Sequence, residues 1–290
     1  MFDPKQMTHE IQNKKDQIEQ ALTQCIEPLK KKSSLYASIA YSIFSGGKRI
    51  RPLFLLSAYE TMSGGKPIEP ALIPACALEL IHSYSLIHDD LPCMDNSDKR
   101  RGKATNHIIY GEDIALLAGD ALLTYAFMLL SGKECKKYLD NEQMVQLVHC
   151  LSYHSGINGM VEGQAFELIQ EDLKMENIHY IDEHKTAALF SASFIMGGIV
   201  AKVNFEHLDR LGSLGRSFGH AFQIADDISD FDPSSNESNI VKLLGKEKSI
   251  ELYQQHMIKV NHTLDQIYTT FDHPSLKNLI SWIQHTSNIV

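Results

Sequence analysis

Apolar residues recur along most of this chain at the spacing of an α-helix. In residues 5–32, Ile18, Leu22 and Ile26 follow one another at intervals of four and share one face. Lys30–Lys32 are expected to close this helix, because the helix dipole favours cations at the C-terminal end. The same periodicity predicts further helices, at 34–44, 52–63, 75–90, 112–131, 142–170, 178–202, 205–230, 240–270 and 275–286.

No alternating strand pattern of useful length and no internal repeat interrupts these helices. The sequence therefore predicts an all-α fold, organised as one domain over residues 1–290.

Two groups of carboxylates lie at the ends of apolar helical runs. Each group contains three aspartates, namely Asp89, Asp90 and Asp95 in the first, and Asp226, Asp227 and Asp230 in the second. Carboxylates are rarely buried without a partner, and six of them around one cavity would repel each other. Magnesium removes the repulsion, since Mg²⁺ binds one or two carboxylates together with substrate phosphate oxygens. We therefore predict that both groups face one apolar cleft as magnesium sites.

The spacing within the two groups differs. Asp226 and Asp230 are four residues apart and share a helix face. Asp89 and Asp95 are six apart, so a straight helix would turn them away from each other. Pro92 is expected to kink or stop the helix, because proline lacks a backbone donor and clashes with the preceding turn. Asp95 can then swing back towards Asp89.

Two basic segments suit phosphate. Gly46–Pro52 combines paired glycines with three cations at the start of a helix, where free backbone donors and the dipole favour an anion. Taken alone, that segment is equally consistent with a solvated basic turn that binds no phosphate. The run 98–103 follows the first acidic group directly, which favours Arg100 and Arg101 as phosphate ligands. A lone Gln or Lys inside a helix, such as Gln164 or Lys185, is by itself an ordinary surface or core residue.

Composition narrows the class of protein. The net charge of −9 argues against general nucleic-acid binding. The five cysteines are scattered without a C-x-x-C pair, which indicates reduced thiols and a cytoplasmic location. No secretory leader is expected, and no uninterrupted apolar run reaches the length of a membrane span.

Six motifs occur in order between residues 30 and 231. They are Gly-Gly-Lys-Arg-Ile-Arg-Pro at 46–52, His-Asp-Asp-Leu-Pro-Cys-Met-Asp at 88–95 followed by Arg-Arg-Gly, Ala-Gly-Asp-Ala-Leu at 118–122, Gly-Gln at 163, His-Lys-Thr at 184 and Phe-Gln-Ile-Ala-Asp-Asp-Ile-Ser-Asp at 222–230. Together they closely resemble the trans-isoprenyl diphosphate synthases, in particular the bacterial farnesyl and geranylgeranyl diphosphate synthases.

The resemblance implies the isoprenoid synthase fold, a bundle of long antiparallel helices around a deep apolar central pocket, usually as a homodimer. It implies head-to-tail condensation of an allylic diphosphate (dimethylallyl or geranyl) with isopentenyl diphosphate, with three Mg²⁺ per site. The farnesyl product is favoured, and geranylgeranyl diphosphate is the alternative.

The resemblance also implies a role for each matching position. The metal ligands would be Asp89, Asp95 and Asp226, supported by Asp90, Asp227 and Asp230. Isopentenyl diphosphate would be held by Gly47, Lys48, Arg51, His82 and Arg101. The allylic diphosphate would be held by Arg100 and Lys185. Lys185, the carbonyl of Thr186 and Gln223 would face the developing cation, with Gln164 behind them.

Product length depends on two further positions in this family. Tyr84 and Ser85, five and four residues before the first aspartate, would shape the pocket floor. An aromatic residue at the former position, with two extra residues inside the acidic motif, is typical of a fifteen-carbon product.

The resemblance weakens after Asp230. The following loop is shorter than in the family, and Glu237 and Asn239 stand where Lys and Thr are expected. This predicts weaker binding of the allylic substrate and poorer exclusion of water. Two other readings stay open: a terpene cyclase or head-to-head condensing enzyme, and a low-activity or non-catalytic prenyl synthase subunit.

Overall fold

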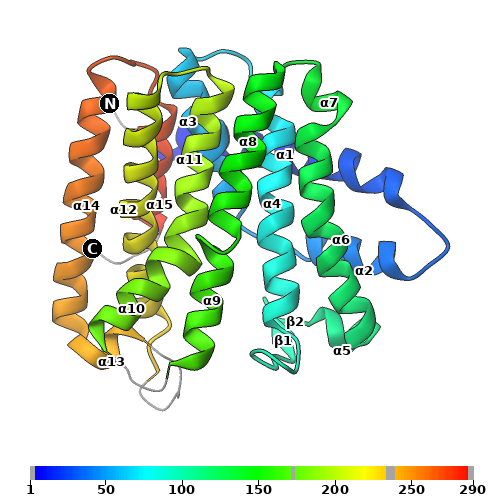
Figure 1. Cartoon of the computed structure of the whole chain (residues 1–290). Coiled ribbons are helices and arrows are strands. Elements are labelled where there is room, and N and C mark those ends of the chain that lie inside the picture. The colour runs from blue at the N-terminus through cyan, green and yellow to red at the C-terminus, as the bar shows by residue number, and fades with distance from the viewer. Residues whose placement is uncertain (1–3, 171–173, 233–238, 287–290) are drawn as a thin grey trace. The chain divides into compact units, whose positions relative to one another are not determined.

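The computed structural model describes residues 4–170, 174–232 and 239–286, and these are almost entirely helical (Figure 1). The helices are α1 (Pro4–Ile26), α2 (Leu35–Phe44), α3 (Ile50–Ser63), α4 (Glu69–Asp89), α5 (Asn106–Tyr110), α6 (Glu112–Ser131), α7 (Lys133–Lys136), α8 (Asn141–Ser155), α9 (Met160–Ile169), α10 (Met175–Ile181), α11 (Ala188–Val200), α12 (Phe205–Ser229), α13 (Ile240–Leu244), α14 (Lys246–Tyr268) and α15 (Ser275–Thr286). A π-helical turn, Asp182–Ala187, links α10 to α11. The strands of the described part are β1 (Lys99–Arg100) and β2 (Lys103–Ala104), an antiparallel pair.

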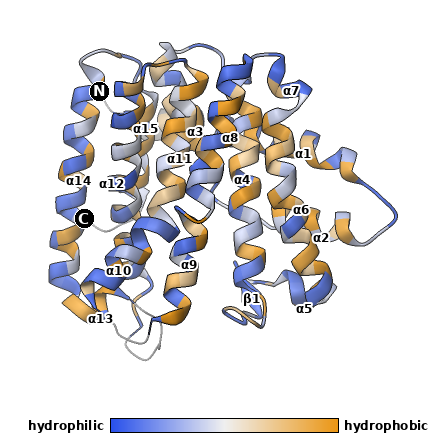
Figure 2. Cartoon of the chain, in the orientation of Figure 1, coloured by the Kyte–Doolittle hydropathy of each residue, from blue (hydrophilic) through white to orange (hydrophobic). Residues whose placement is uncertain are grey.

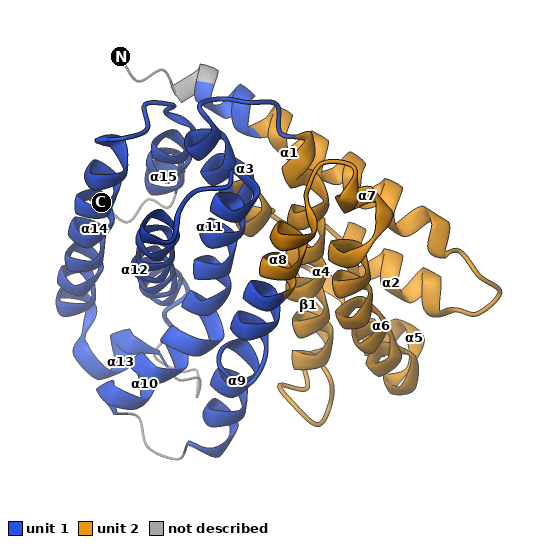
Figure 3. Cartoon of the chain, turned by 45° about the horizontal axis from the view of Figure 1, so that its top comes forward, with its two compact units in different colours: residues 1–11, 54–68, 149–290 blue, residues 12–53, 69–148 orange. Residues whose placement is uncertain are grey.

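The chain divides into two compact units (Figure 3). Unit 1 comprises residues 1–11, 54–68 and 149–290, and unit 2 comprises residues 12–53 and 69–148. The all-α class is confirmed, whereas the single domain over residues 1–290 stays a prediction.

Unit 2 is built around the packing of α4 on α6. Gly119 of α6 makes the close approach possible, because a Cβ there would lie 2.0 Å from Nε2 of His88. His88 in turn lies 3.0 Å from the carbonyl oxygen of Leu116. Helix α1 joins this core through Tyr125, whose hydroxyl donates to the carbonyl of Cys25.

Unit 1 has an aromatic core between α11, α12 and the start of its α3 segment. The Phe54 ring lies 4.6 Å from each of the rings of Phe194 and Phe218. Gly215 brings the backbones of α11 and α12 together, since a Cβ there would lie 2.6 Å from Cα of Ser191. In Figure 2 hydrophobic residues follow α11, while α14 alternates hydrophilic and hydrophobic positions, as expected for a buried and an amphipathic helix.

Several predicted helix boundaries need correction. The first helix ends at Ile26, and Pro28 lies in a 3₁₀ turn that follows it. Lys30–Lys32 therefore lie beyond the helix, and the dipole argument for them was wrong. The predicted helix 142–170 is two helices, because Gly159 adopts a conformation in which a Cβ would lie 2.0 Å from a backbone oxygen. The predicted helix 240–270 is likewise divided at Gly245, which has a φ of 80°.

The apolar content of two helices adds to the prediction that no uninterrupted apolar run reaches the length of a membrane span. Two described helical segments, Glu69–Asp89 and Glu112–Lys136, are long and apolar enough to cross a membrane by length and composition. In the first, 67% of the apolar window is buried inside the protein, as in the core helix of a water-soluble fold. In the second only 39% is buried, so α6 presents an apolar face on the surface.

Candidate active site

The first acidic group lies where α4 ends, as predicted. The helix stops at Asp89, and the chain then folds back on it. The backbone N–H of Asp95 donates to the carbonyl of Asp89 over 2.9 Å, and that of Asn96 donates to Leu91 over 3.1 Å. Pro92 lies inside this loop, beyond the end of the helix, so its lack of a backbone N–H breaks no helical hydrogen bond. The two aspartates are thus brought to the same end of the helix despite their spacing.

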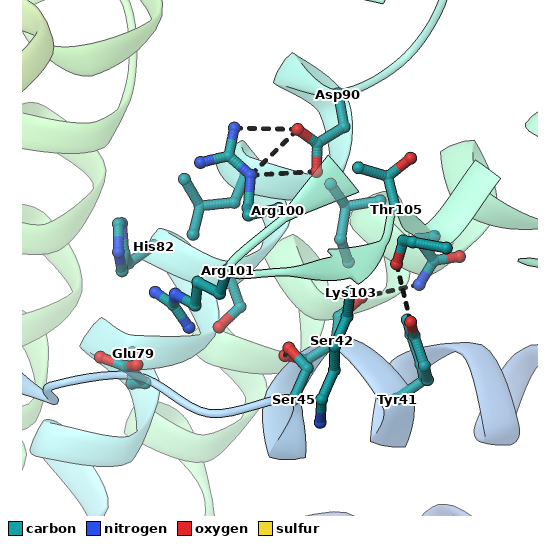
Figure 4. Close-up of a pocket in the computed structure, with 15 residues that line it drawn as sticks. Tyr41, Ser42, Ser45, Glu79, His82, Asp90, Arg100, Arg101, Lys103 and Thr105 are labelled. Atoms are coloured by element: carbon teal, nitrogen blue, oxygen red, sulfur yellow. Dashed lines mark hydrogen bonds and ion pairs between the residues drawn. The ribbon is translucent and has the colours of Figure 1, made fainter. Parts of the chain in front are cut away.

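Asp90 holds the second basic segment. Its buried carboxylate accepts from Nε of Arg100 at 2.9 and 3.0 Å and from Nη2 at 2.8 Å (Figure 4). Arg100 belongs to the β1–β2 hairpin, whose turn residues Arg101 and Gly102 have φ of 53° and 75°. Two positive φ values are what a type I′ hairpin turn requires. The acidic and basic segments therefore form one substructure.

The first basic segment meets that hairpin. Nη1 of Arg101 donates to the carbonyl of Gly46. A side chain at Gly47 would obstruct this contact, because its Cβ would lie 2.8 Å from Nη1 of Arg101. Lys48 is exposed, whereas Arg49 is buried. The segment therefore presents fewer cations to a phosphate than the three in its sequence.

His82 lines a cavity of unit 2 together with Arg100 and Arg101. Its Nε2 is 3.5 Å from Nη1 of Arg51. Burial, followed by the charges of Arg51 and Arg101, holds the pKa of His82 well below its usual value. The imidazole is therefore neutral at pH 7. Three cations line the cavity together with two carboxylates, Glu79 and Asp90, of which Asp90 is paired with Arg100. The polar and charged lining residues are Tyr41, Ser42, Ser45, Glu79, His82, Asp90, Arg100, Arg101, Lys103, Thr105 and Asn106 (Figure 4).

Tyr84 and Ser85 lie on α4 just before the acidic group. Tyr84 is only 5% exposed, and its ring meets that of His88 edge-on at 5.7 Å. Burial, with a smaller contribution from the charge of Asp89, raises the pKa of Tyr84 to about 12. The hydroxyl of Ser85 donates to the carbonyl of His82 over 3.0 Å. Tyr84 is therefore a neutral, fixed aromatic wall.

The second acidic group lies at the end of α12 in unit 1. The N–H of Asp230 donates to the carbonyl of Asp226 over 2.8 Å, and both residues are exposed on one helix face. Asp227 is instead half-buried. Its carboxylate accepts from Nε2 of Gln223 and from the N–H of Ile240, each over 2.9 Å. Burial raises the pKa of Asp227, while these two hydrogen bonds oppose that rise.

Asn239 ties the following segment to this group. Its amide nitrogen donates to the carbonyl of Asp227 over 3.0 Å, and its oxygen caps α13 by accepting from Val241. Asn239, at the position where Thr is expected in the family, thus supports the acidic group by holding the backbone of Asp227. Glu237, the other predicted departure, lies outside the described residues.

A second cavity lies in unit 1, beside the π-helical turn. It is lined by Glu167, Ile178, Ile181, Asp182, Lys185, Thr186, Gln223 and Asp227. The Lys185 ammonium pairs with Glu167. The hydroxyl of Thr186 donates to Oε1 of Gln223 over 3.0 Å, and this continues the chain of hydrogen bonds to Asp227. The structure therefore brings together all three residues predicted to face the cation.

Glycines explain why the turn lies so close to its neighbours. A Cβ at Gly163 would lie 2.3 Å from the backbone nitrogen of Lys185, and one at Gly219 would lie 2.5 Å from Cα of Ala187. The Gly-Gln motif thus permits close packing of α9 on the turn. Both amide atoms of Gln164 are hidden from solvent without a hydrogen-bond partner among the described residues. π-Helical turns are rare and frequently occur at functional sites.

Sequence reasoning missed two acidic residues of this cavity, Glu167 and Asp182. Burial, followed by the charges of Asp227 and Glu167, raises the pKa of Asp182 well above its usual range. Asp182 thus keeps its proton to a higher pH than an exposed aspartate does, which eases the crowding of three acidic groups around one lysine. No periodic signal marks the π-helical turn, so Asp182 reads as a surface residue in the sequence.

Four aspartates that are exposed or half-buried fit magnesium. Asp89 and Asp95 at one helix end, and Asp226 and Asp230 at another, supply the oxygen ligands that this cation prefers. Within residues 4–170, 174–232 and 239–286, no three or more His, Cys, Asp or Glu side chains are grouped closely enough to hold an ion. Magnesium bound through one or two carboxylates, phosphate oxygens and water needs no such group.

Comparison with known proteins gives a consistent result. The polyprenyl synthetase family profile matches residues 32–247, which extends beyond the point where the motifs end. A chloroplastic geranylgeranyl pyrophosphate synthase of Catharanthus roseus is 38% identical over 271 residues, covering 88% of this chain and 72% of that protein. The farnesyl diphosphate synthase of Geobacillus stearothermophilus is 41% identical over 241 residues, covering 82% and 80%.

A solved structure agrees. The geranyltransferase of Legionella pneumophila matches with a TM-score of 0.86 at 30% identity over 98% of each chain. The helical architecture is therefore the isoprenoid synthase fold. The chain belongs to the polyprenyl synthetase family, and it is a prenyltransferase that synthesises trans-prenyl diphosphates.

Proposed function

We propose that this enzyme condenses dimethylallyl or geranyl diphosphate head-to-tail with isopentenyl diphosphate to give farnesyl diphosphate. The C–O bond of the allylic diphosphate breaks, and the double bond of isopentenyl diphosphate attacks the resulting cation. A new C–C bond forms, and the departing diphosphate takes the proton that is released. The burial of the Tyr84 ring beside the first acidic group carries the choice of a fifteen-carbon product.

The isopentenyl diphosphate would bind in unit 2. His82 and Arg101 line a polar cavity there, Arg51 lies 3.5 Å from His82, and Arg101 contacts the loop that carries Gly47 and Lys48. Neutral His82 can donate one N–H to a phosphate without the cost of desolvating another charge. This arrangement supports the binding of a diphosphate that is not cleaved.

The allylic diphosphate would bind through Arg100 and Lys185. Asp90 orients Arg100, while Lys185 would exchange its ion pair with Glu167 for the diphosphate. The oxygen dipoles of Thr186 and Gln223 can then stabilise the allylic cation, provided that their orientation is fixed beforehand. The hydrogen-bonded chain through Gln223 to Asp227 supports such a fixed orientation.

We propose Mg²⁺ as the cofactor, three per site, held by Asp89, Asp95 and Asp226 and supported by Asp90, Asp227 and Asp230. Bound magnesium would neutralise the diphosphate and make it a better leaving group. Asp226 and Asp230 present their carboxylates from one exposed helix face, which suits a hydrated cation.

Geranylgeranyl diphosphate is the second candidate product. Relatives named as farnesyl and as geranylgeranyl synthases match this chain at similar identity, 41% and 38%. Only the product can separate the two. Mass spectrometry of the products from geranyl and isopentenyl diphosphate should show a fifteen-carbon diphosphate. A twenty-carbon main product would overturn the choice of farnesyl diphosphate, and the absence of any condensation would overturn the proposed function.

We also propose a cytoplasmic homodimer. All five cysteines are free, as expected in a reducing compartment. Helix α6 exposes Leu116, Leu117 and Met128, whose side chains are 47%, 51% and 58% exposed. Large apolar side chains exposed on one helix favour a protein interface there. Light scattering should give twice the chain mass, and Leu117→Glu should give a monomer.

A further inference from the structure

Arg49 is buried, although it lies in a basic loop that contacts the hairpin residue Arg101. Its side chain is 2% exposed. The guanidinium donates from Nε to Glu19 over 2.8 Å and from Nη1 to Glu79 over 2.6 Å. Nη2 donates to the other oxygen of Glu19 over 3.3 Å and to the carbonyl of Ile43. One side chain thus joins α1, α4 and the end of α2.

The backbone of the loop is held in an unfavourable conformation. Arg49 has a φ of 54°, in the left-handed region that is unfavourable for a non-glycine residue. Gly46 and Gly47, with φ of 108° and 148°, supply the other unusual angles. Such a loop keeps its shape only where the surroundings impose it. The buried contacts of Arg49 are the strongest such constraint in the loop.

The orientation of Arg49 determines where its neighbours point. Because Arg49 turns inward, Lys48 on one side is exposed. Arg51, two residues further on, lies in the first turn of α3 and is 3.5 Å from His82. Glu79, which holds Arg49, lines the same cavity as His82 and Arg101. The network therefore reaches the cavity without exposing Arg49 to it.

We propose that Arg49 is a positioning residue, which clamps the Gly46–Arg51 loop to Glu19 and Glu79 and so places Lys48 and Arg51 for the diphosphate of isopentenyl diphosphate. This inference rests on the proposed function. Arg49 does not touch the substrate, so its loss should act on one substrate more than on the other.

The first test variant is Arg49→Lys. A lysine keeps a positive charge beside Glu79, so the buried carboxylate is not left unpaired and the protein should fold. A single ammonium cannot reproduce the planar fork that reaches Glu19, Glu79 and Ile43 together. The second variant is the double substitution Arg49→Met and Glu79→Met, which leaves no buried charge unpaired, because the remaining partner, Glu19, is 35% exposed and stays solvated.

The matched control is Leu264→Ala in α14 of unit 1. Leu264 is 3% exposed, so its truncation lowers the melting temperature through a cavity, far along the chain from the loop. This control separates an effect on the loop from a general loss of stability.

Steady-state kinetics with each substrate varied in turn provide the readout. We expect both Arg49 variants to raise KM for isopentenyl diphosphate by about tenfold to a hundredfold, as for a displaced binding group, and to leave KM for the allylic substrate within about twofold. Leu264→Ala should change neither KM. An unchanged KM for isopentenyl diphosphate, or an equal rise in both constants, would overturn the proposal. If the wild-type protein condensed no isopentenyl diphosphate at all, the proposed function would fail instead.

Discussion

The pairing of Asp90 with Arg100 leads to a prediction that differs from a simple metal-ligand role. Asp90 is 4% exposed, and both of its carboxylate oxygens accept from Arg100 at 2.8–3.0 Å. Asp90→Asn keeps the volume but removes the charge and one acceptor. Arg100 would keep its charge and lose its fixed orientation. We therefore expect weaker binding of the allylic diphosphate.

The size of the effect follows from the exposure of the pair. A hydrogen bond to a charged group contributes about 1.5–3 kcal/mol. The Arg100 side chain is 36% exposed, so solvent screening places this pair near the lower limit, about 1.5–2 kcal/mol. At about 1.4 kcal/mol per factor of ten, KM for the allylic substrate should rise about ten- to thirtyfold.

A double-mutant cycle tests this reasoning. Asp90→Asn, Arg100→Met and the double variant are compared for allylic KM and for the Mg²⁺ concentration that gives half-maximal activity. If Asp90 acts through Arg100, Asp90→Asn should add less than about twofold once Arg100 is gone. Asp89→Asn is the control that should shift the magnesium requirement. If Asp90→Asn raised the Mg²⁺ concentration for half-maximal activity equally with and without Arg100, Asp90 would not act by anchoring Arg100.

Three further predictions concern product length and pH. Tyr84→Ala should lengthen the main product beyond fifteen carbons in a mass-spectrometric assay, while Tyr84→Phe, which keeps the ring, should leave the length at fifteen; unchanged length in Tyr84→Ala would contradict the role of the ring. Asp182→Asn should raise the melting temperature more at pH 8 than at pH 4. Burial, Asp227 and Glu167 raise the pKa of Asp182 in the folded protein, so this carboxyl costs stability increasingly as pH rises above its ordinary value of 3.8. A lower melting temperature at pH 8 would count against this. Burial lowers the pKa of His154 to about 4, so between pH 6.5 and 4 the unfolded chain binds a proton that the folded chain does not. Urea unfolding should show stability falling by up to about 1.4 kcal/mol per pH unit from this group as pH drops below 6.5, and His154→Phe should reduce the slope; an unchanged slope would exclude His154.

Periodicity predicted the long elements well, because a helix with one buried face carries that burial in its sequence. The predicted helices 112–131 and 275–286 match α6 and α15 at both ends. The behaviour of Pro92 was also predictable, since proline ends a helix through its own covalent structure. The short elements α5, α7 and the hairpin were missed, because each is shorter than the window in which a period can be recognised.

The site was harder to predict wherever a side chain depends on distant partners. Arg49 reads as a phosphate ligand in sequence, but Glu19 and Glu79, each thirty residues away, bury it. Asp90 reads as a metal ligand, and its contact with Arg100 depends on the geometry of the hairpin turn. The π-helical turn depends on glycines at 163 and 219, which the helical pattern treats as neutral positions.

The central claim is that both acidic groups bind magnesium-loaded diphosphate. Calorimetric titration of inorganic diphosphate, with and without Mg²⁺, tests it on the wild type, on Asp89→Asn/Asp95→Asn and on Asp226→Asn/Asp230→Asn. We expect the wild type to bind diphosphate tightly and only with Mg²⁺, and each double variant to lose most of that affinity. Equal, magnesium-dependent binding by either double variant would contradict it.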